Sequence, residues 1–263
     1  MSSDNTRVNA TLPDWLTYKT GSNLMRVGKD HDGGYLIPVS DILKSEVLVS
    51  LGINDDWSFE KAFHAMNAVP VFAFDASVDY AFFLKRVLKT AIRLDRTFIR
   101  AIRSLVSYPQ FFQGSCVHIK KFVADDQSGE QFLAMARVFE LTDSNQLYLK
   151  IDIEGSEYSI LETLVCYSNR LTGLVIEFHD CQSRLSEIRD FIGAFDLQLV
   201  HVHGNNYGTP DHPTRVPRAL EFTFSRNAET LPITLQPHPL DQPNNRRIPE
   251  LIFQNGLDSF VRP

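Results

Sequence analysis

Short apolar runs alternate along this chain with segments whose apolar residues recur at helical spacing. The runs predict five strands, at Glu46–Leu51, Val69–Asp75, Cys116–Val123, Leu147–Ile153 and Leu174–Phe178. The intervening and following segments predict helices, at Trp57–Asn67, Tyr80–Leu105, Gly129–Phe139, Ser156–Tyr167 and Ser183–Phe195. Strands and helices that alternate in this way are typical of βαβ units, so we expect an α/β fold with a mainly parallel sheet.

Two more apolar runs, Gln198–His203 and Leu220–Ser225, follow the last predicted helix. Only a polar loop separates them, so we expect these two strands to pair antiparallel at one edge of the sheet. We expect one domain over residues 1–263, with an N-terminal segment 1–45, a basic helical insertion at about 80–114 and a C-terminal tail 227–263.

Composition and charge indicate which partners and which cellular compartment to expect for this domain. The net charge of −6 gives no reason to expect binding to nucleic acid, so we predict no nucleic-acid partner. The chain has 3 cysteines with no CxxC spacing, which argues against a disulfide framework or a zinc ribbon and favours the cytoplasm. The N-terminus lacks the basic start and apolar run of a signal peptide, and no stretch approaches the ~20 apolar residues of a membrane span.

One predicted helical region is strongly basic, although the protein as a whole is acidic. The region that begins at Tyr80 contains a single acid, Asp95, and seven cations: Lys85, Arg86, Lys89, Arg93, Arg96, Arg100 and Arg103. It is either a solvated helix face, a substrate lid, a dimer contact, or a surface for peripheral contact with an anionic membrane or polysaccharide.

The first predicted strand ends without a phosphate-binding fingerprint. Gly52 is followed by Asn54, Asp55 and Asp56, and these two acids would repel a phosphate. Asp75 ends the second strand at the separation from Gly52 where an acid would hold a ribose. Ribose without pyrophosphate indicates S-adenosylmethionine as the cofactor, although an Asp after a strand is also a common turn or cap residue.

The third strand ends in "VADDQSG", where Asp125 or Asp126 is placed to accept a hydrogen bond from the adenine amino group. Either residue is equally suited to cap the helix that follows.

Carboxylates and imidazoles accumulate at the ends of the later strands. Side chains of this kind would repel one another at a single sheet edge unless a cation or shared protons relieved the repulsion. Oxygen donors with some imidazole favour Mg²⁺, Mn²⁺ or Ca²⁺ over a structural zinc. The residues are Asp152, Glu154, Glu157, Glu177, His179, Asp180, His201, His203 and Glu221.

Several stretches together resemble the FkbM-type methyltransferases, a family of S-adenosylmethionine-dependent O-methyltransferases. They are "RVGKDHDGGYLIP", "VLVSLGINDDWSFE", "FAFDAS", "LYLKIDIEGSEYSIL", "LVIEFHD" and "HVHGNNYG", and they extend over roughly Arg26 to Arg226. The resemblance implies a Rossmann-like, seven-stranded class I methyltransferase sheet with an antiparallel edge pair and helices on both faces. It also implies cofactor contacts around Gly52, Asp75 and Asp125, and acceptors that are hydroxyls of sugars, glycolipids or secondary metabolites.

These features together predict the residues of a methyl-transfer site. Asp152, Glu177 and His179 are the predicted metal ligands or proton acceptors, and His201 or His203 would reach the acceptor as a base or ligand. The catalytic set is Asp152, His179, His201 and His203. The predicted cofactor-binding residues are Arg26, Tyr35, Gly52, Asn54, Asp75, Ala76, Asp125 and Asp152.

We therefore expect an O-methyltransferase that acts on a small-molecule or glycan acceptor, assisted by Mg²⁺ or Mn²⁺. Two alternatives remain open: a metal-dependent hydrolase built on the His/Glu/Asp cluster, and a non-catalytic module that binds glycans or lipid surfaces through the basic helix. The sequence does not indicate an oligomeric state.

Overall fold

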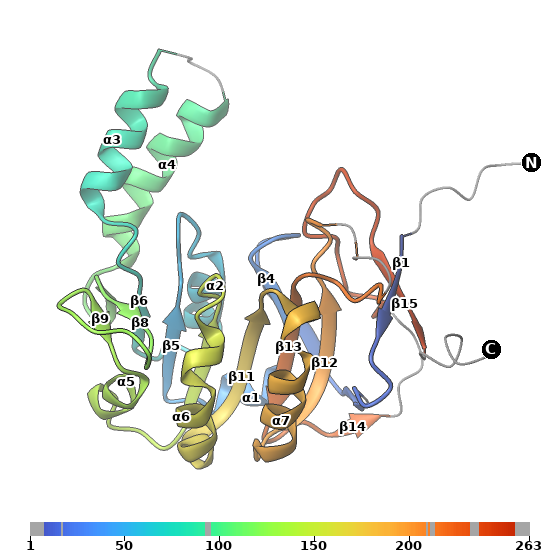
Figure 1. Cartoon of the computed structure of the whole chain (residues 1–263). Helices are drawn as coiled ribbons and strands as arrows, with labels where there is room; N and C mark the ends of the chain where they lie inside the picture. Colours follow the sequence, from blue (N-terminus) through green and yellow to red (C-terminus); the bar gives the residue numbers. More distant parts are fainter. Residues whose placement is uncertain are drawn as a thin grey trace, which may run out of the picture.

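The computed structural model describes residues 8–16, 18–92, 96–208, 210, 214–231 and 237–255. Its centre is a seven-stranded sheet with the order β12-β13-β11-β10-β5-β6-β7 (Figure 1). The strands are β5 (Val47–Leu51), β6 (Val71–Phe74), β7 (Cys116–Ile119), β10 (Leu147–Ile151), β11 (Leu171–Phe178), β12 (Gln198–Gly204) and β13 (Leu220–Ser225).

The sheet confirms the predicted topology. β5 pairs in parallel with β10 and β6, β6 pairs in parallel with β7, and β10 pairs in parallel with β11. β13 lies between β11 and β12 and is antiparallel to both. Among the described residues between β12 and β13 none is helical, and the two strands run antiparallel, as the polar loop in the sequence predicted.

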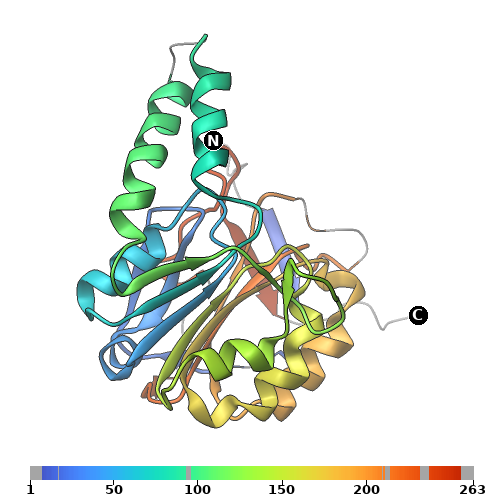
Figure 2. The same ribbon diagram turned by 90° about the vertical axis from the view of Figure 1, so that its left-hand side faces the viewer.

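Helices cover both faces of the sheet, as expected. α1 (Val39–Lys44) and α2 (Ser58–Met66) cover one face, and α5 (Met135–Leu141), α6 (Leu161–Cys166) and α7 (Leu185–Ala194) cover the other (Figures 1 and 2). Successive side chains of β10 point to opposite faces of the sheet and pack in two separate cores. Tyr148 packs beside α2, and Leu147 and Leu149 pack on the other face.

The basic region forms two helices rather than one. α3 (Tyr80–Thr90) and α4 (Arg96–Phe111) make a hairpin that projects from the body of the molecule (Figures 1 and 2). At its base, Phe83 and Tyr108 pack against Trp57. Farther out, the hairpin exposes aliphatic side chains: Leu84, Leu88, Ile92, Ile99, Ile102 and Val106.

Four short strand pairs and three 3₁₀ turns complete the described part of the chain. The pairs are β1 (Val8–Leu12) with β15 (Leu251–Asn255), β2 (Thr20–Gly21) with β14 (Thr230–Leu231), β3 (Leu24–Gly28) with β4 (Gly34–Pro38), and β8 (Phe122–Val123) with β9 (Phe132–Leu133). The turns are η1 (Glu157–Ile160), η2 (Ser168–Arg170) and η3 (Cys181–Ser183). Within the described ranges, no helix combines the length and apolarity needed to cross a bilayer.

A buried acid in α1 makes stability depend on pH. Asp41 is 0% exposed, and burial raises its pKa to about 6. The folded state therefore holds a proton that the unfolded chain has released, and stability falls as pH rises from about 4 to about 6. At pH 8 we expect Asp41→Asn to unfold at a higher denaturant concentration than wild type, with a free energy of unfolding larger by up to about 3 kcal/mol. The advantage should vanish below about pH 4, and Asp190→Asn on the exposed part of α7 should show none of it.

Candidate active site

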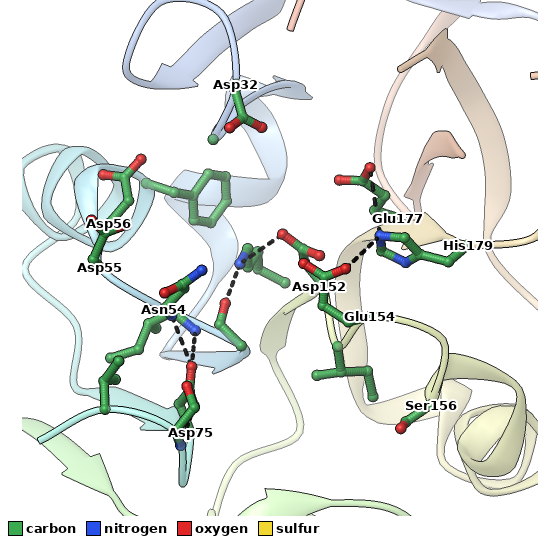
Figure 3. Close-up of a pocket in the computed structure, with 18 of the residues that line it drawn as sticks. Asp32, Asn54, Asp55, Asp56, Asp75, Asp152, Glu154, Ser156, Glu177 and His179 are labelled. Atoms are coloured by element: carbon green, nitrogen blue, oxygen red, sulfur yellow. Dashed lines mark hydrogen bonds and ion pairs between the residues drawn. The ribbon is translucent and has the colours of Figure 1, made fainter. Parts of the chain in front are cut away.

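One large cavity opens at the carboxyl ends of the parallel strands, where ligands bind in open α/β sheets. Its volume is about 1100 Å³, enough for a nucleoside-sized cofactor together with part of an acceptor. The loops after β5, β6, β10 and β11 all contribute to its wall. Figure 3 shows Asp75 and His179 on opposite sides of this space. The cavity thus brings together residues that the sequence spreads over more than half the chain.

The loop after β5 touches the loop after β10. Gly52 has φ +77°, and a Cβ at this position would lie 1.8 Å from the backbone oxygen of Asp152. Only glycine allows both this backbone conformation and this close approach. Asn54, two residues on, also has a positive φ of 44°. The predicted positions Gly52 and Asn54 therefore both line the cavity on a tightly constrained loop.

Asp75 holds that loop in place. Its Oδ2 accepts hydrogen bonds from the backbone amides of Ile53 (3.0 Å) and Asn54 (2.8 Å). Its Oδ1 accepts from the amide and the hydroxyl of Ser77, at 2.7 and 2.6 Å. A carboxylate has about four acceptor sites, so protein donors fill all of them here. Asp75 lines the cavity as predicted, but a ribose hydroxyl would reach it only by displacing a donor such as the Ser77 hydroxyl.

The two acids of the first loop have cationic partners within the chain. Asp55 forms an ion pair with Arg86 of α3, and Asp56 forms one with Lys29 at 2.5 Å. Both acids line the cavity. These two ion pairs hold the first loop against Lys29 on one side and against the base of the hairpin on the other.

An apolar end of the cavity lies beside β8 and β9. The rings of Phe122 and Phe132 lie 5.9 Å apart and line the cavity with Val123 and Ala124. Asp125 is not among the lining residues. Its carboxylate accepts hydrogen bonds from the amide of Met135 and the hydroxyl of Thr163, so it caps α5, the alternative reading of this acid.

Asp152 faces the cavity from the end of β10. Its Oδ2 is 3.4 Å from the Tyr35 hydroxyl and 3.9 Å from the Lys150 Nζ. Lys150 is buried and also donates a 2.5 Å hydrogen bond to the Gly52 oxygen. Burial raises the pKa of Tyr35, which keeps its hydroxyl protonated as a donor. Asp152 thus has two neighbouring donors, one on either side of its carboxylate.

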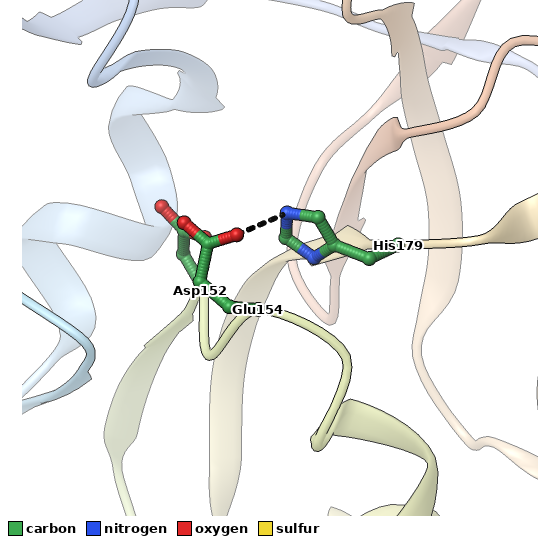
Figure 4. A group of neighbouring side chains, drawn as sticks. All are labelled: Asp152, Glu154 and His179. Atoms are coloured by element: carbon green, nitrogen blue, oxygen red, sulfur yellow. Dashed lines mark ion pairs between the residues drawn. The ribbon is translucent and has the colours of Figure 1, made fainter.

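His179 lies among carboxylates (Figure 4). Its Nδ1 is 3.0 Å from Oε1 of Glu157, and its Nε2 is 3.5 Å from Glu154 and 3.9 Å from Glu177. Burial would lower the pKa of His179, but the hydrogen bond that its Nδ1–H donates to Glu157 and the charges of the surrounding carboxylates raise the pKa to about 9. Burial and Asp152 raise the pKa of Glu177 well above its usual range.

Three of these groups could hold a metal ion. Asp152, Glu154 and His179 each present one ligand atom, and these atoms lie within 4.8 Å of one another. The structure therefore groups Glu154 with Asp152 and His179, where the sequence had suggested Glu177. Glu177 instead accepts a 2.8 Å hydrogen bond from Asn205.

His201 and His203 lie on one face of β12, as predicted, but they do not line the cavity. The C-terminal tail covers that face. His201 pairs with Asp241 at 2.9 Å, and His203 pairs with Glu221 at 3.0 Å and with Glu250 at 3.3 Å. Burial alone would lower the pKa of His203, but Glu221 raises it well above its usual range. Both histidines anchor the tail, and their predicted role beside the acceptor is not supported by this geometry.

Two other predicted cofactor ligands also lie outside the cavity lining. The Arg26 guanidinium donates to the backbone oxygens of Lys29 and His31, so it braces the β3–β4 turn. Ala76 lies between two lining residues and is not one itself. Tyr35 does line the cavity, and so does Asp32 of the turn, whose pKa burial raises.

Sequence reasoning missed two buried charges that organise the site. Lys150 is absent from the predicted site residues, yet it links Gly52 to Asp152. Glu157 is absent from the predicted catalytic, cofactor-binding and metal-binding residues, yet it is 0% exposed and its Oε1 also accepts hydrogen bonds from the amides of Ile153 and Gly155. The signal for Lys150 was its place on the polar face of the strand.

The strand order decides the fold. A parallel sheet whose last strand, β13, inserts antiparallel between β11 and the edge strand β12 is the arrangement expected from the sequence. This is the class I methyltransferase fold. No family model matches the sequence, and no curated protein matches it. The FkbM resemblance therefore remains a prediction.

Solved structures of similar fold include several methyltransferases. An rRNA methylase from Streptococcus thermophilus is 11% identical, with 71% of this chain and 92% of that chain covered and a TM-score of 0.38. A precorrin-6y C5,15-methyltransferase from Geobacter metallireducens is 12% identical, with 71% and 84% covered and a TM-score of 0.39. The Methanococcus jannaschii fibrillarin pre-rRNA processing protein is 10% identical, with 70% and 68% covered and a TM-score of 0.39. Likeness at this level says nothing about the acceptor.

One prediction about partners is corrected. The net charge was taken to exclude nucleic acid, yet the structures of similar fold include an rRNA methylase and a putative tRNA (m1A22) methyltransferase from Streptococcus pneumoniae in complex with S-adenosylmethionine. Proteins of this fold are therefore found among enzymes named for RNA substrates. Net charge alone is no ground for excluding a class of partner, and we carry no partner class forward from it.

Proposed function

We propose that this chain is an S-adenosylmethionine-dependent O-methyltransferase of the FkbM type. Its proposed acceptor is a hydroxyl of a sugar, glycan, glycolipid or secondary metabolite. One observation carries the proposal: a single cavity on a class I methyltransferase sheet joins an apolar end to an end rich in carboxylates. The first loop has no phosphate fingerprint, which fits a cofactor that contains adenosine but no phosphate.

The cofactor fits the two ends of the cavity as follows. The rings of Phe122 and Phe132 would hold the adenine, and Asp75 would receive the ribose in place of the Ser77 hydroxyl. Asp32 and Tyr35 would face the amino-acid end, where a carboxylate favours the ammonium group. S-adenosylmethionine supplies the methyl group and the leaving group of an in-line displacement.

Asp152 is the proposed proton acceptor for the acceptor hydroxyl. It faces the cavity, its side chain is 28% exposed, and Tyr35 and Lys150 hold it from two sides. His179 is held by Glu157, so its proposed role is to orient the acceptor and the carboxylates rather than to take the proton. Holding the acceptor oxygen in line with the methyl group is expected to supply ~7–11 kcal/mol of the barrier.

A divalent cation fits the same end of the cavity. Asp152 and Glu154 would supply oxygen ligands and His179 its Nε2, while Glu157 fixes the ring through Nδ1. A carboxylate behind a histidine is the usual support of a metal-binding imidazole. Such an ion would lower the pKa of the acceptor hydroxyl. The same group of residues is what favours the alternative, a metal-dependent hydrolase.

Titration calorimetry tests the proposal directly. We expect saturable binding of S-adenosylmethionine and S-adenosylhomocysteine at one site per chain, because the cavity of about 1100 Å³ joins the proposed adenine, ribose and amino-acid positions in one space. Mg²⁺ or Mn²⁺ should bind as well, and Glu154→Gln should weaken that binding while leaving S-adenosylhomocysteine binding in place. Binding of metal without either nucleoside would favour the hydrolase. Binding of neither nucleoside would reject the methyltransferase.

A further inference from the structure

A chain of hydrogen bonds connects the α3–α4 hairpin to the loop that follows β5. The Tyr108 hydroxyl on α4 lies 2.5 Å from Nδ1 of His118 on β7. The other ring nitrogen of His118, Nε2, lies 2.8 Å from the backbone oxygen of Asp75. The carboxylate of Asp75 in turn accepts hydrogen bonds from the backbone amides of Ile53 and Asn54. The path thus runs from a helix outside the sheet to the first loop of the cavity.

The backbone oxygen of Asp75 determines which atom donates in each bond of this chain. A backbone oxygen only accepts, so His118 must donate to Asp75 through Nε2–H. Burial lowers the pKa of His118, so the ring is neutral, and its Nδ1 is left to accept the proton of the Tyr108 hydroxyl. Tyr108 therefore selects the tautomer in which His118 holds Asp75.

Hydrogen bonds hold both the backbone and the carboxylate of Asp75. Its own amide donates to the oxygen of Ile119 at 3.2 Å, so both sides of its backbone are held by β7. A second link runs in parallel, because Arg86 of α3 pairs with Asp55 of the same loop. Trp57, which follows that loop, packs edge-on against Tyr108 with ring centroids 5.7 Å apart.

We propose that Tyr108 and His118 are positioning residues for the cofactor, and that through them the base of the hairpin fixes the first loop of the cavity. This inference rests on the proposed function, because it concerns the affinity for S-adenosylmethionine. Neither residue lines the cavity, so each acts through Asp75. The hairpin is then part of the cofactor site, although most of it projects away from the body.

The test is Tyr108→Phe, which removes the hydroxyl and keeps the ring that packs against Trp57 and Phe83. We expect the dissociation constant for S-adenosylhomocysteine to rise about three- to tenfold, the net contribution of one hydrogen bond. The acceptor KM and the kcat at saturating cofactor should stay near wild type. Tyr80→Phe, at the exposed start of α3, removes an equivalent hydroxyl and should leave the affinity unchanged.

His118 provides a second pair of variants. His118→Gln keeps an N–H donor for the Asp75 oxygen and should bind S-adenosylhomocysteine more tightly than His118→Leu, which has none. A purely structural role would instead lower the melting temperature of both variants without this difference in affinity.

Hydrogen exchange in the cofactor-free protein gives a readout that needs no ligand. We expect the amides of Ile53 and Asn54 to exchange faster in Tyr108→Phe than in wild type, and at the wild-type rate in Tyr80→Phe. If Tyr108→Phe changes neither the exchange nor the affinity while wild type binds the cofactor, the positioning role is overturned alone. If wild type binds neither nucleoside, the proposed function and the cofactor role of the hairpin both fall.

Discussion

Replacing Asp152 by Asn should lower kcat for methyl transfer by at least about 100-fold, the low end of what a general base contributes. The amide keeps the shape of the carboxylate but does not accept the proton of the acceptor hydroxyl. Binding of S-adenosylhomocysteine should change little, because Asp75, the proposed ribose partner, lies across the cavity from Asp152 (Figure 3). The measurement is the rate of S-adenosylhomocysteine formation with a verified acceptor, together with calorimetry of the product.

Asp190→Asn is the matched control for this substitution. It makes the same chemical change on the exposed part of α7, where the side chain is 74% exposed. It should keep the wild-type rate. A rate for Asp152→Asn near that of wild type would show that another group takes the proton, and would remove Asp152 from the centre of the mechanism.

Replacing Gly52 by Ala should damage both folding and cofactor binding. The new Cβ would meet the backbone oxygen of Asp152 at 1.8 Å, and the φ of +77° disfavours any side chain. Backbone atoms do not move aside as a flexible side chain does, so the loops after β5 and β10 must separate. We expect a loss of about 1–3 kcal/mol in the free energy of unfolding, the usual cost of overpacking, and at least tenfold weaker binding of S-adenosylhomocysteine.

Gly193→Ala tests whether the effect belongs to the position or to the residue type. Gly193 lies in α7, and nothing would lie within 4 Å of its Cβ. Alanine is the better helix former, so this variant should be more stable than wild type by about 0.5–1 kcal/mol. If denaturant unfolding and calorimetry found Gly52→Ala equal to wild type, the close approach of the two loops would not matter to the site.

The sheet was predictable because its signals are local. Runs such as Val47–Leu51 and Leu147–Ile151 form strands buried on both faces, and the polar loop that the sequence shows after Gln198–His203 predicted the antiparallel pair. The reversal inside the basic region was not predictable. α3 ends at Thr90 and α4 begins at Arg96, and helical periodicity is nearly the same before and after the turn.

For the site, the sequence predicted only the face of its strand on which each side chain lies. Parity placed Lys150 and Asp152 on one face of the strand, and it placed His201 and His203 together on β12. Parity did not say what packs on the face of β12 that carries the two histidines. The C-terminal tail packs there, and its Asp241, 40 residues after His201 in the chain, pairs with that histidine. A local pattern gives the direction of a side chain, while its partner depends on the tertiary fold.

The structure also differs from the prediction at Asp125, because a local pattern did not reveal which partner this acid has. An acid after a strand has one sequence signal and two uses, as a ligand or as a cap. The structure uses Asp125 as the cap of α5, and Phe122 and Phe132 line the cavity in its place. Their pairing is between β8 and β9, two strands of two residues each, which are too short to predict.

The pairing of β1 with β15 has a consequence for the order of folding. Val8 lies opposite Leu251 and Leu12 opposite Asn255, so the two strands come from opposite regions of the chain. During synthesis the ribosome makes β15 only after every strand of the central sheet. Until then β1 lacks the strand with which it pairs in parallel. Contacts between such distant segments form slowly, so β1 is expected to be the last of the amino-terminal strands to gain protection against proteolysis in a nascent chain.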